Sequence, residues 1–407
     1  MLTFAQVPTG SRDKKVGIQL TALVCVVAAA THAIWAIVST PSAPIYDQAV
    51  LLRGVVPWPM PSDGLTARLW VQLWRGSWAL DPSMLNTVVR CASAVAYLAT
   101  AAWLATLVLS HRSSVALAIL GISAAGFPTL WLSSELFVGA SLCVAIGVIG
   151  TRQSTWIRGV ALAVLAGSKP DLMLVAIALL IFVGREEPPT EQLRALAAVV
   201  APWLLFVILG VTFHGLSYLQ FDSWIGRRGF DSVMQHYAAM LWAQQLGARP
   251  DPWQNWSTYR DAVVPMANSL RTFIQIYPER YLDFVALSCA QSAARIVRAF
   301  GLWLVVAFVL AIWIRRRSLE ACRWERLFWV AAVDLAPLVL LSFVHVRYCA
   351  RFAPIVILFP LSVLERTKRV PTVASAALAI VFAIGVWDLI PRFIVDAPAG
   401  ATYWFPD

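Results

Sequence analysis

Residues 157–184 read IRGVALAVLAGSKPDLMLVAIALLIFVG, an apolar run interrupted near its middle by Lys-Pro-Asp at 169–171. A helix needs about 20 consecutive apolar residues to cross a bilayer, so each half is short for a crossing. Proline frees backbone groups, and a lysine close to the hydrocarbon favours an anionic partner. The run therefore predicts a broken helix pair, 157–168 and 171–184, with its junction at or just below the outer membrane surface.

The composition extends this prediction to the whole chain. Of the 407 residues, 59% are hydrophobic and 13% are charged, whereas a soluble domain has about 45–50% apolar and about 25% charged residues. This balance excludes a soluble globular protein. The net charge of +10 is explained mostly by basic residues on one side of the membrane. Six scattered cysteines without CxxC pairs predict neither a disulfide framework nor a zinc site.

The pattern of apolar stretches predicts an all-α polytopic membrane protein with about eleven crossings. The other predicted spans are 17–38, 89–110, 114–132, 136–150, 193–213, 297–314, 327–344, 352–364 and 371–390. With a cytoplasmic N-terminus, the basic turns fall in the cytoplasm, as the positive-inside rule predicts, and the C-terminal tail lies outside. A cleavable signal peptide competes with an uncleaved anchor for the first span, and its length favours the anchor.

This topology divides the chain into three parts. They are an N-terminal membrane module (1–213) with a first outer loop (39–88), an outer helical segment (214–296), and C-terminal membrane helices with an outer tail (297–407). The cytoplasmic connections are too short to build a site, so the chemistry is expected on the outer side of the membrane.

The first outer loop contains a predicted amphipathic helix. Trp70, Trp74 and Trp78 recur at i, i+4 and i+8 beside Leu69 and Leu73. Because tryptophan prefers the headgroup level, we expect this helix to lie flat on the membrane surface. A helix that packs on the protein is the alternative.

Polar side chains close to the hydrocarbon are costly and are therefore functional candidates. On the outer side they are Asp47, Glu135, Lys169, Arg295, Arg298, His345, Arg347, Tyr348 and Arg351. Each also has a plainer interpretation: a loop carboxylate or helix cap for Asp47, a turn cap for Glu135, pairing with Asp171 for Lys169, and interfacial anchoring for the remainder. Asp334, inside an apolar stretch, is protonated, paired or facing a wet cavity.

A carboxylate base beside several cations is what a transfer reaction from a lipid phosphate needs. Arginine and lysine bind phosphate best when they are partly desolvated. The sequence contains no Gly-rich nucleotide loop, so we expect an activated substrate that is already in the membrane.

This order of features resembles the GT-C superfamily of integral-membrane glycosyltransferases. The similarity rests on Asp47 after the first helix, the amphipathic helix of the same loop, the Ser134-Glu135 turn, the stretch 158–170 with its basic-proline junction, and the Arg347-Tyr348 turn. The resemblance covers residues 1–213 best. It implies transfer of a sugar from a polyprenyl-phosphate donor to a glycan, glycolipid or protein acceptor on the outer face of the cell membrane, or on the lumenal face of the ER.

The resemblance also implies roles for the candidate residues. Asp47 would be the general base on the acceptor hydroxyl in an inverting single displacement. The donor phosphate would contact Lys169, Arg347, Arg295 and Arg298, with Glu135, His345, Tyr348 and Arg351 supporting the phosphate or the acceptor. Because Asp47 has no adjacent acidic partner, a bound divalent metal is not supported, and no other cofactor is firmly implied.

Two further classes of protein stay open. A transporter or lipid flippase also uses interrupted helices and buried acids, and Asp334 with Lys169 would then be an ion-coupled pair. The two halves of the chain show no repeat, which disfavours that class. A non-catalytic scaffold for envelope assembly would tolerate neutralisation of Asp47 and Lys169. For a transferase, mannose, arabinose, glucose, galactose and aminoarabinose are all candidate sugars.

Overall fold

The computed structural model describes residues 9–39, 82–126, 133–169, 172–184, 227–245, 252–320, 322–342, 348–367 and 373–395, with shorter pieces within 66–74 and 189–212 and at position 344. Every regular element in this part of the chain is a helix, and none is a strand. The prediction of an all-α protein is confirmed.

The helices of the described residues follow one another in this order along the chain. They are α1 (Thr9–Ser39), α4 (Pro82–Val108), α5 (Arg112–Gly126), α6 (Ser133–Gly150), α7 (Thr155–Ala166), α8 (Leu172–Gly184), α10 (Arg227–Gln245), α11 (Pro252–Val263), α12 (Leu270–Ile276), α13 (Pro278–Ser318), α14 (Arg323–Ala331), the 3₁₀ turn η4 (Ala332–Asp334), α15 (Leu335–Leu341), α16 (Cys349–Thr367) and α17 (Val373–Val395).

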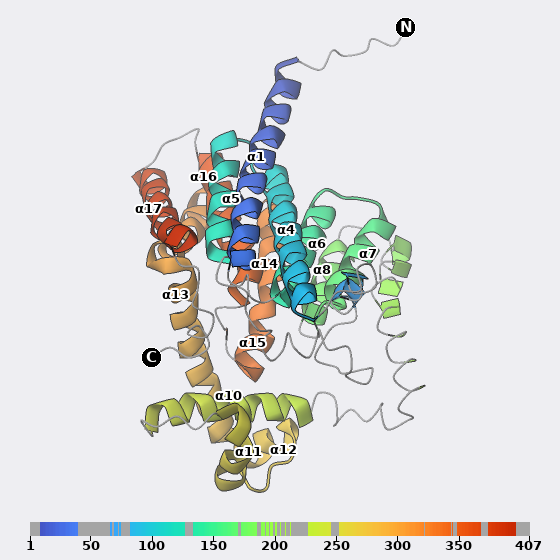
Figure 1. Ribbon diagram of the computed structural model, residues 1–407, viewed down its shortest axis with the longest axis vertical. Coiled ribbons are helices and arrows are strands. Elements are labelled where there is room, and N and C mark those ends of the chain that lie inside the picture. The colour runs from blue at the N-terminus through green and yellow to red at the C-terminus, as the bar shows by residue number, and fades with distance from the viewer. Residues whose placement is uncertain are drawn as a thin grey trace.

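Most of these helices form one elongated bundle (Figure 1). α1 enters at the upper end of the view and runs downward, and α4 returns beside it. α10 lies across the opposite end, with α11 and α12 beside it, and the long α13 connects this unit to the bundle. We call the end of the bundle nearest α10 the lower end and the opposite end the upper end.

Helices occupy the predicted apolar stretches wherever these stretches are described. Among the described residues, three helices are long and apolar enough to cross a membrane, namely those at Asp13–Ser39, Met84–Val108 and Pro278–Arg317. The shorter apolar helices lie at Arg112–Gly126, Glu135–Gly150, Thr155–Ala166, Leu172–Val183 and Val373–Leu389. The predicted span 193–213 lies mostly outside the described residues. These helices fit a membrane protein, and the number of crossings stays a prediction.

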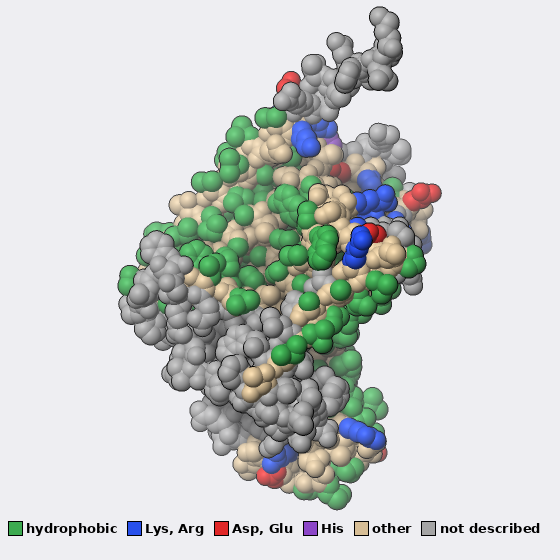
Figure 2. All heavy atoms as spheres, turned by 90° about the vertical axis from the view of Figure 1, so that its right-hand side faces the viewer, with side chains coloured by type: hydrophobic (Ala, Val, Ile, Leu, Met, Phe, Trp, Pro, Cys, Tyr) green, Lys and Arg blue, Asp and Glu red, His purple; other side chains and the backbone are tan. Residues whose placement is uncertain are grey.

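The surface of the bundle is also apolar. Leu20, Leu23, Val24 and Val27 of α1 are each more than half exposed. Figure 2 shows hydrophobic side chains covering much of one face, with Lys and Arg gathered toward the upper end and others on the lower unit. A soluble protein rarely exposes so large an apolar surface, whereas a lipid environment requires one.

The predicted single span 327–344 is divided into α14, η4 and α15. Pro337 lacks the N–H that would bond to the carbonyl of Val333, and its ring crowds that carbonyl. The chain tightens into a 3₁₀ turn at Ala332–Asp334. Asp334 therefore lies at a helix junction and not in the middle of a continuous helix.

α13 is interrupted at Gly301, which has φ 74° and ψ 154°. Such a conformation is essentially restricted to glycine, so the position marks a break between a lower and an upper helix. The upper part carries the apolar span, and the lower part reaches the α10 unit.

Gly301→Ala is expected to lower the free energy of unfolding by about 1–3 kcal/mol, because alanine is strained in this backbone conformation. No other atom lies within 4 Å of the added methyl, so the cost is conformational. Thermal unfolding of the purified protein in detergent measures it. Gly17→Ala in α1 is the control, since its methyl meets only the movable guanidinium of Arg112; equal losses in the two variants would contradict the prediction.

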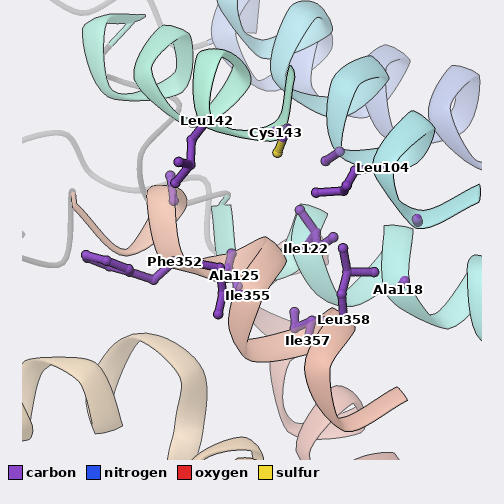
Figure 3. Packing of buried hydrophobic residues seen from close by; sticks show 14 of the residues in the cluster. Leu104, Ala118, Ile122, Ala125, Leu142, Cys143, Phe352, Ile355, Ile357 and Leu358 are labelled. Carbon is purple, nitrogen blue, oxygen red and sulfur yellow. The ribbon is translucent and has the colours of Figure 1, made fainter. Parts of the chain in front are cut away.

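The main hydrophobic core lies between α4, α5, α6 and α16 (Figure 3). Leu104, Ile122 and Leu358 gather there, and Leu142 lies toward Phe352. Leu104, Ile122, Leu142 and Leu358 are each at most 1% exposed. Burial of such side chains contributes roughly 1.5–3 kcal/mol each. This core joins segments that are more than 200 residues apart along the chain. It therefore holds the first turns of α6 and α16 in fixed positions relative to each other.

The lower unit has a hydrophobic core of its own, built from α10, α11, α12 and the start of α13. Its buried members include Phe230, Tyr237, Phe273 and Phe284. The Tyr237 hydroxyl donates a 2.6 Å hydrogen bond to Asp283; burial first, and then this bond, raise the pKa of Tyr237 above its ordinary value.

A later segment, residues 340–344, fastens this unit to the bundle. The hydroxyls of Ser232 and Tyr281 donate to the carbonyls of Leu341 and Leu340, at 3.0 and 3.2 Å. Ser342 hydrogen-bonds His236 at 2.9 Å.

The upper end has its own charged contacts. Buried Glu325 pairs with Arg315 and Arg366. Glu365 accepts hydrogen bonds from the backbone N–H groups of Ser110 and His111, at 2.7 and 3.0 Å, where α5 begins. A carboxylate there satisfies exposed helix donors and complements the helix dipole.

Candidate functional site

Glu135 lies in the first turn of α6 and is 2% exposed. Its Oε2 accepts a 2.8 Å hydrogen bond from Nε of Arg351, and its Oε1 pairs with Nζ of Lys169. A carboxylate at this position also faces the positive end of the helix dipole. Glu135 thus contacts two cations from two distant parts of the chain.

Lys169 lies in the short connection between α7 and α8. Backbone hydrogen bonds from Gly167 to Ala163 and from Ser168 to Leu165 end α7 just before it. The proline at 170 cannot continue the helix, because it has no backbone N–H to donate, and this explains locally why α7 ends here. The Lys169 side chain is 21% exposed; the alternative partner, Asp171, lies outside the described residues.

Arg351, in the first turn of α16, joins Glu135 to a second acid. Its Nη1 lies 3.1 Å from Oδ2 of Asp334, and both side chains are fully buried. Of the three states expected for Asp334, the structure supports the paired one. Glu135, Lys169, Asp334 and Arg351 are hereafter called the ion cluster.

Tyr348 completes the cluster through its aromatic ring. Nζ of Lys169 lies 5.0 Å from the ring centroid, and Cζ of Arg351 lies 4.9 Å from it. Such cation–π contacts contribute roughly 0.5–2 kcal/mol. The adjacent backbone is held by Tyr97, whose hydroxyl donates a 2.7 Å hydrogen bond to the carbonyl of Ala350.

The two carboxylates of the cluster balance its two cations. Removing charges from water is expensive, and this cost is offset only by close pairing of the kind seen here. The four side chains come from α6, the α7–α8 connection, η4 and α16, so the cluster also fixes these elements relative to one another. Lys169 is its solvent-accessible member.

The segment predicted to form the first outer loop contacts the same connection. Thr66 donates its N–H to the carbonyl of Gly167 and its hydroxyl to that of Val164, both at 2.9 Å. A methyl at Gly167 would approach Thr66 to 2.8 Å, so glycine permits this close contact. The loop predicted to carry Asp47 is therefore anchored within three residues of Lys169.

Trp70 and Trp74 of this loop face the protein. Trp70 stacks on Phe137 with ring centroids 5.4 Å apart and donates a 3.0 Å hydrogen bond to Ser93. Leu69 and Leu73 are more than half exposed. The alternative of a packing helix thus describes Trp70 better than the expectation of a headgroup anchor does, while Trp78 lies outside the described residues.

The structure places the other predicted residues as follows. Arg295 is half-buried on α13, and Arg298 is exposed. Asp47, His345 and Arg347 lie outside the described residues. Within the described ranges no group of three His, Cys, Asp or Glu side chains could hold a metal ion.

Sequence reasoning had named most members of the cluster but not their pairing. The sequence marks Asp334 as a costly carboxylate in an apolar stretch but does not assign it to the transferase site. The feature of the sequence that could have indicated this pairing is an isolated aspartate in an apolar stretch, followed 17 residues later by Arg351. Thr66 and Tyr97 carried no recognisable signal, since neither residue type is unusual at its position.

Comparison with known protein families, with curated proteins and with solved structures finds no match to this chain.

Proposed function

We propose that this chain is a membrane glycosyltransferase that moves a sugar from a polyprenyl-phosphate donor to an envelope glycan, glycolipid or protein acceptor. The observation that carries the proposal is the position of Lys169. It is a partly exposed cation at the rim of a buried ion cluster, in the connection on which the first outer loop docks.

The proposal includes the topology of the chain. Eleven crossings would place the upper end and the N-terminus in the cytoplasm, and the lower end, the ion cluster and the C-terminal tail on the outer side of a cell membrane. Support comes from the basic residues of the upper end, such as Arg315, Arg323 and Arg366, which follow the positive-inside rule in this orientation.

In the proposed reaction the acceptor hydroxyl oxygen attacks the anomeric carbon of the donor sugar. The bond from that carbon to the phosphate oxygen breaks with its electron pair, and polyprenyl phosphate leaves. Asp47 takes the hydroxyl proton, a contribution of typically about 10²–10⁴-fold. Lys169 stabilises the charge that develops on the departing phosphate.

The test is transfer by purified protein in detergent, where no ion gradient exists. The protein is incubated with polyprenyl-phosphate mannose, arabinose, glucose, galactose or aminoarabinose and with an extract of envelope acceptors. Mass spectrometry then measures polyprenyl phosphate and glycosylated product. We expect acceptor-dependent consumption of one donor, and lack of turnover with every donor would count against the proposal.

A transporter or flippase is the second candidate, favoured by the buried Asp334–Arg351 pair, because intramembrane charges often mark ion pathways. Lys169 pairs with Glu135, Glu135 with Arg351, and Arg351 with Asp334, so such a pathway would run through all four members of the cluster. Gradient-driven flux in proteoliposomes, without covalent change of the lipid, would support this alternative.

Lys169→Met is expected to weaken donor binding about 10- to 100-fold, because a hydrogen bond to a charged group contributes about 1.5–3 kcal/mol. Binding of a radiolabelled donor to protein in nanodiscs measures the effect. Lys14→Met, near the upper end, is the matched control and should bind as the wild type does. An unchanged affinity in Lys169→Met would remove this residue from the donor site.

A further inference from the structure

The two oxygens of Glu135 are held in different ways. Oε2 is bonded to Arg351, which is fully buried and is itself fixed by Asp334. Oε1 is paired with Lys169, which is partly exposed. The contact with Arg351 is therefore shielded from the solvent, whereas the contact with Lys169 is within reach of an incoming anion.

Both partners would keep a favourable contact if the Lys169–Glu135 contact opened. Glu135 would keep its 2.8 Å bond to Arg351. The Lys169 ammonium would keep the Tyr348 ring, whose centroid lies 5.0 Å away, and such a ring stabilises a cation without neutralising it. The ammonium could thus accept a new anion without leaving its place.

From these contacts we infer that Glu135 is a resident counter-ion that occupies Lys169 until an anionic lipid phosphate displaces it. The inference rests on the proposed function for the chemical class of the ligand. Because the cluster is already balanced in charge, an entering phosphate competes with the Glu135 carboxylate for one cation. Glu135 therefore weakens binding of the phosphate and allows polyprenyl phosphate to depart after transfer.

The two possible roles of Glu135 predict opposite changes in phosphate affinity. If Glu135 helped to hold the ligand, Glu135→Gln would weaken binding. If Glu135 is the displaced counter-ion, the same variant frees Lys169 and tightens binding. We expect a roughly two- to fivefold lower Kd, in proportion to the contribution of a partly exposed ion pair.

The experiment measures binding of undecaprenyl phosphate, and of neutral undecaprenol as the uncharged probe, to the full-length protein in nanodiscs. The variants are Glu135→Gln, Lys169→Met, the double variant of these two, and Glu191→Gln as a control that removes a different Glu–Arg pair. We expect Glu135→Gln to bind the phosphate more tightly, the double variant to bind as weakly as Lys169→Met, and the control to match the wild type. Undecaprenol binding should be the same in all of them.

Glu135→Asp provides a second route if the glutamine variant does not fold. The shorter side chain keeps the charge for Arg351 but withdraws it from Lys169, so phosphate binding should again be tighter than in the wild type. Weaker or unchanged phosphate binding in folded Glu135→Gln or Glu135→Asp would overturn the inference, even if Lys169→Met lowers affinity. If Lys169→Met leaves phosphate binding unchanged, the donor site at Lys169 fails as well.

Discussion

Arg351→Met is expected to lower the free energy of unfolding by about 3–5 kcal/mol, the usual cost of removing one partner from a buried ion pair. Arg351 is fully buried and contacts both Glu135 and Asp334. Without Arg351, Asp334 must either keep an unpaired charge in an apolar environment or take up a proton, and both outcomes cost free energy. Thermal unfolding in detergent should show a markedly lower Tm.

Two further variants make this prediction specific. In Arg351→Met/Asp334→Leu the stranded carboxylate is also removed, so part of the lost stability should return. Arg260→Met removes a more exposed arginine that pairs with Asp261 on the surface and should change stability by no more than about 1 kcal/mol. Equal losses for Arg351→Met and Arg260→Met would show that the ion cluster does not fix the bundle.

Asp47→Asn is expected to reduce the rate of sugar transfer by about 10²–10⁴-fold, because the amide cannot accept the proton of the attacking hydroxyl. The substitution keeps the size of the side chain, so donor affinity should stay close to that of the wild type. Single-turnover transfer and donor binding, measured on the same preparation, separate the two effects.

The matched control is Asp63→Asn, which changes another aspartate of the same outer loop. We expect it to retain transfer activity, since Asp63 has no role in the proposed reaction. Full activity in Asp47→Asn would remove this residue from the mechanism. Loss of activity in both variants would instead point to a general effect on the loop.

Local chemistry explains what the sequence could predict. Long apolar runs and the Lys-Pro-Asp interruption located the helices and the α7–α8 connection, because these depend on neighbouring residues alone. The candidates Glu135, Lys169, Tyr348 and Arg351 were recognised as expensive or unusual at their depth, and they do lie together. The function assigned to them remains a proposal.

The pairing within the site depends on contacts that no local pattern encodes. Arg351 and Glu135 are separated by 216 positions along the chain, and their meeting is set by how α6 packs against α16. The loop helix shows the same limit, since the spacing of Trp70 and Trp74 is identical whether they face lipid or protein. Only the positions of Phe137 and Ser93 decide between these two environments.

The fastening of the lower unit by residues 340–344 has a consequence for synthesis of the protein. α10 and the first part of α13 are synthesised well before Ser342. The hydrogen bonds that Ser342 makes with His236 and Ser288 can therefore form only after α15 has been made. Pairings between distant segments form late in folding and leave unfinished surfaces open to aggregation. A fragment that stops at the end of α13 should consequently be prone to degradation, whereas nascent chains that extend past residue 344 can complete the unit and become resistant to proteases.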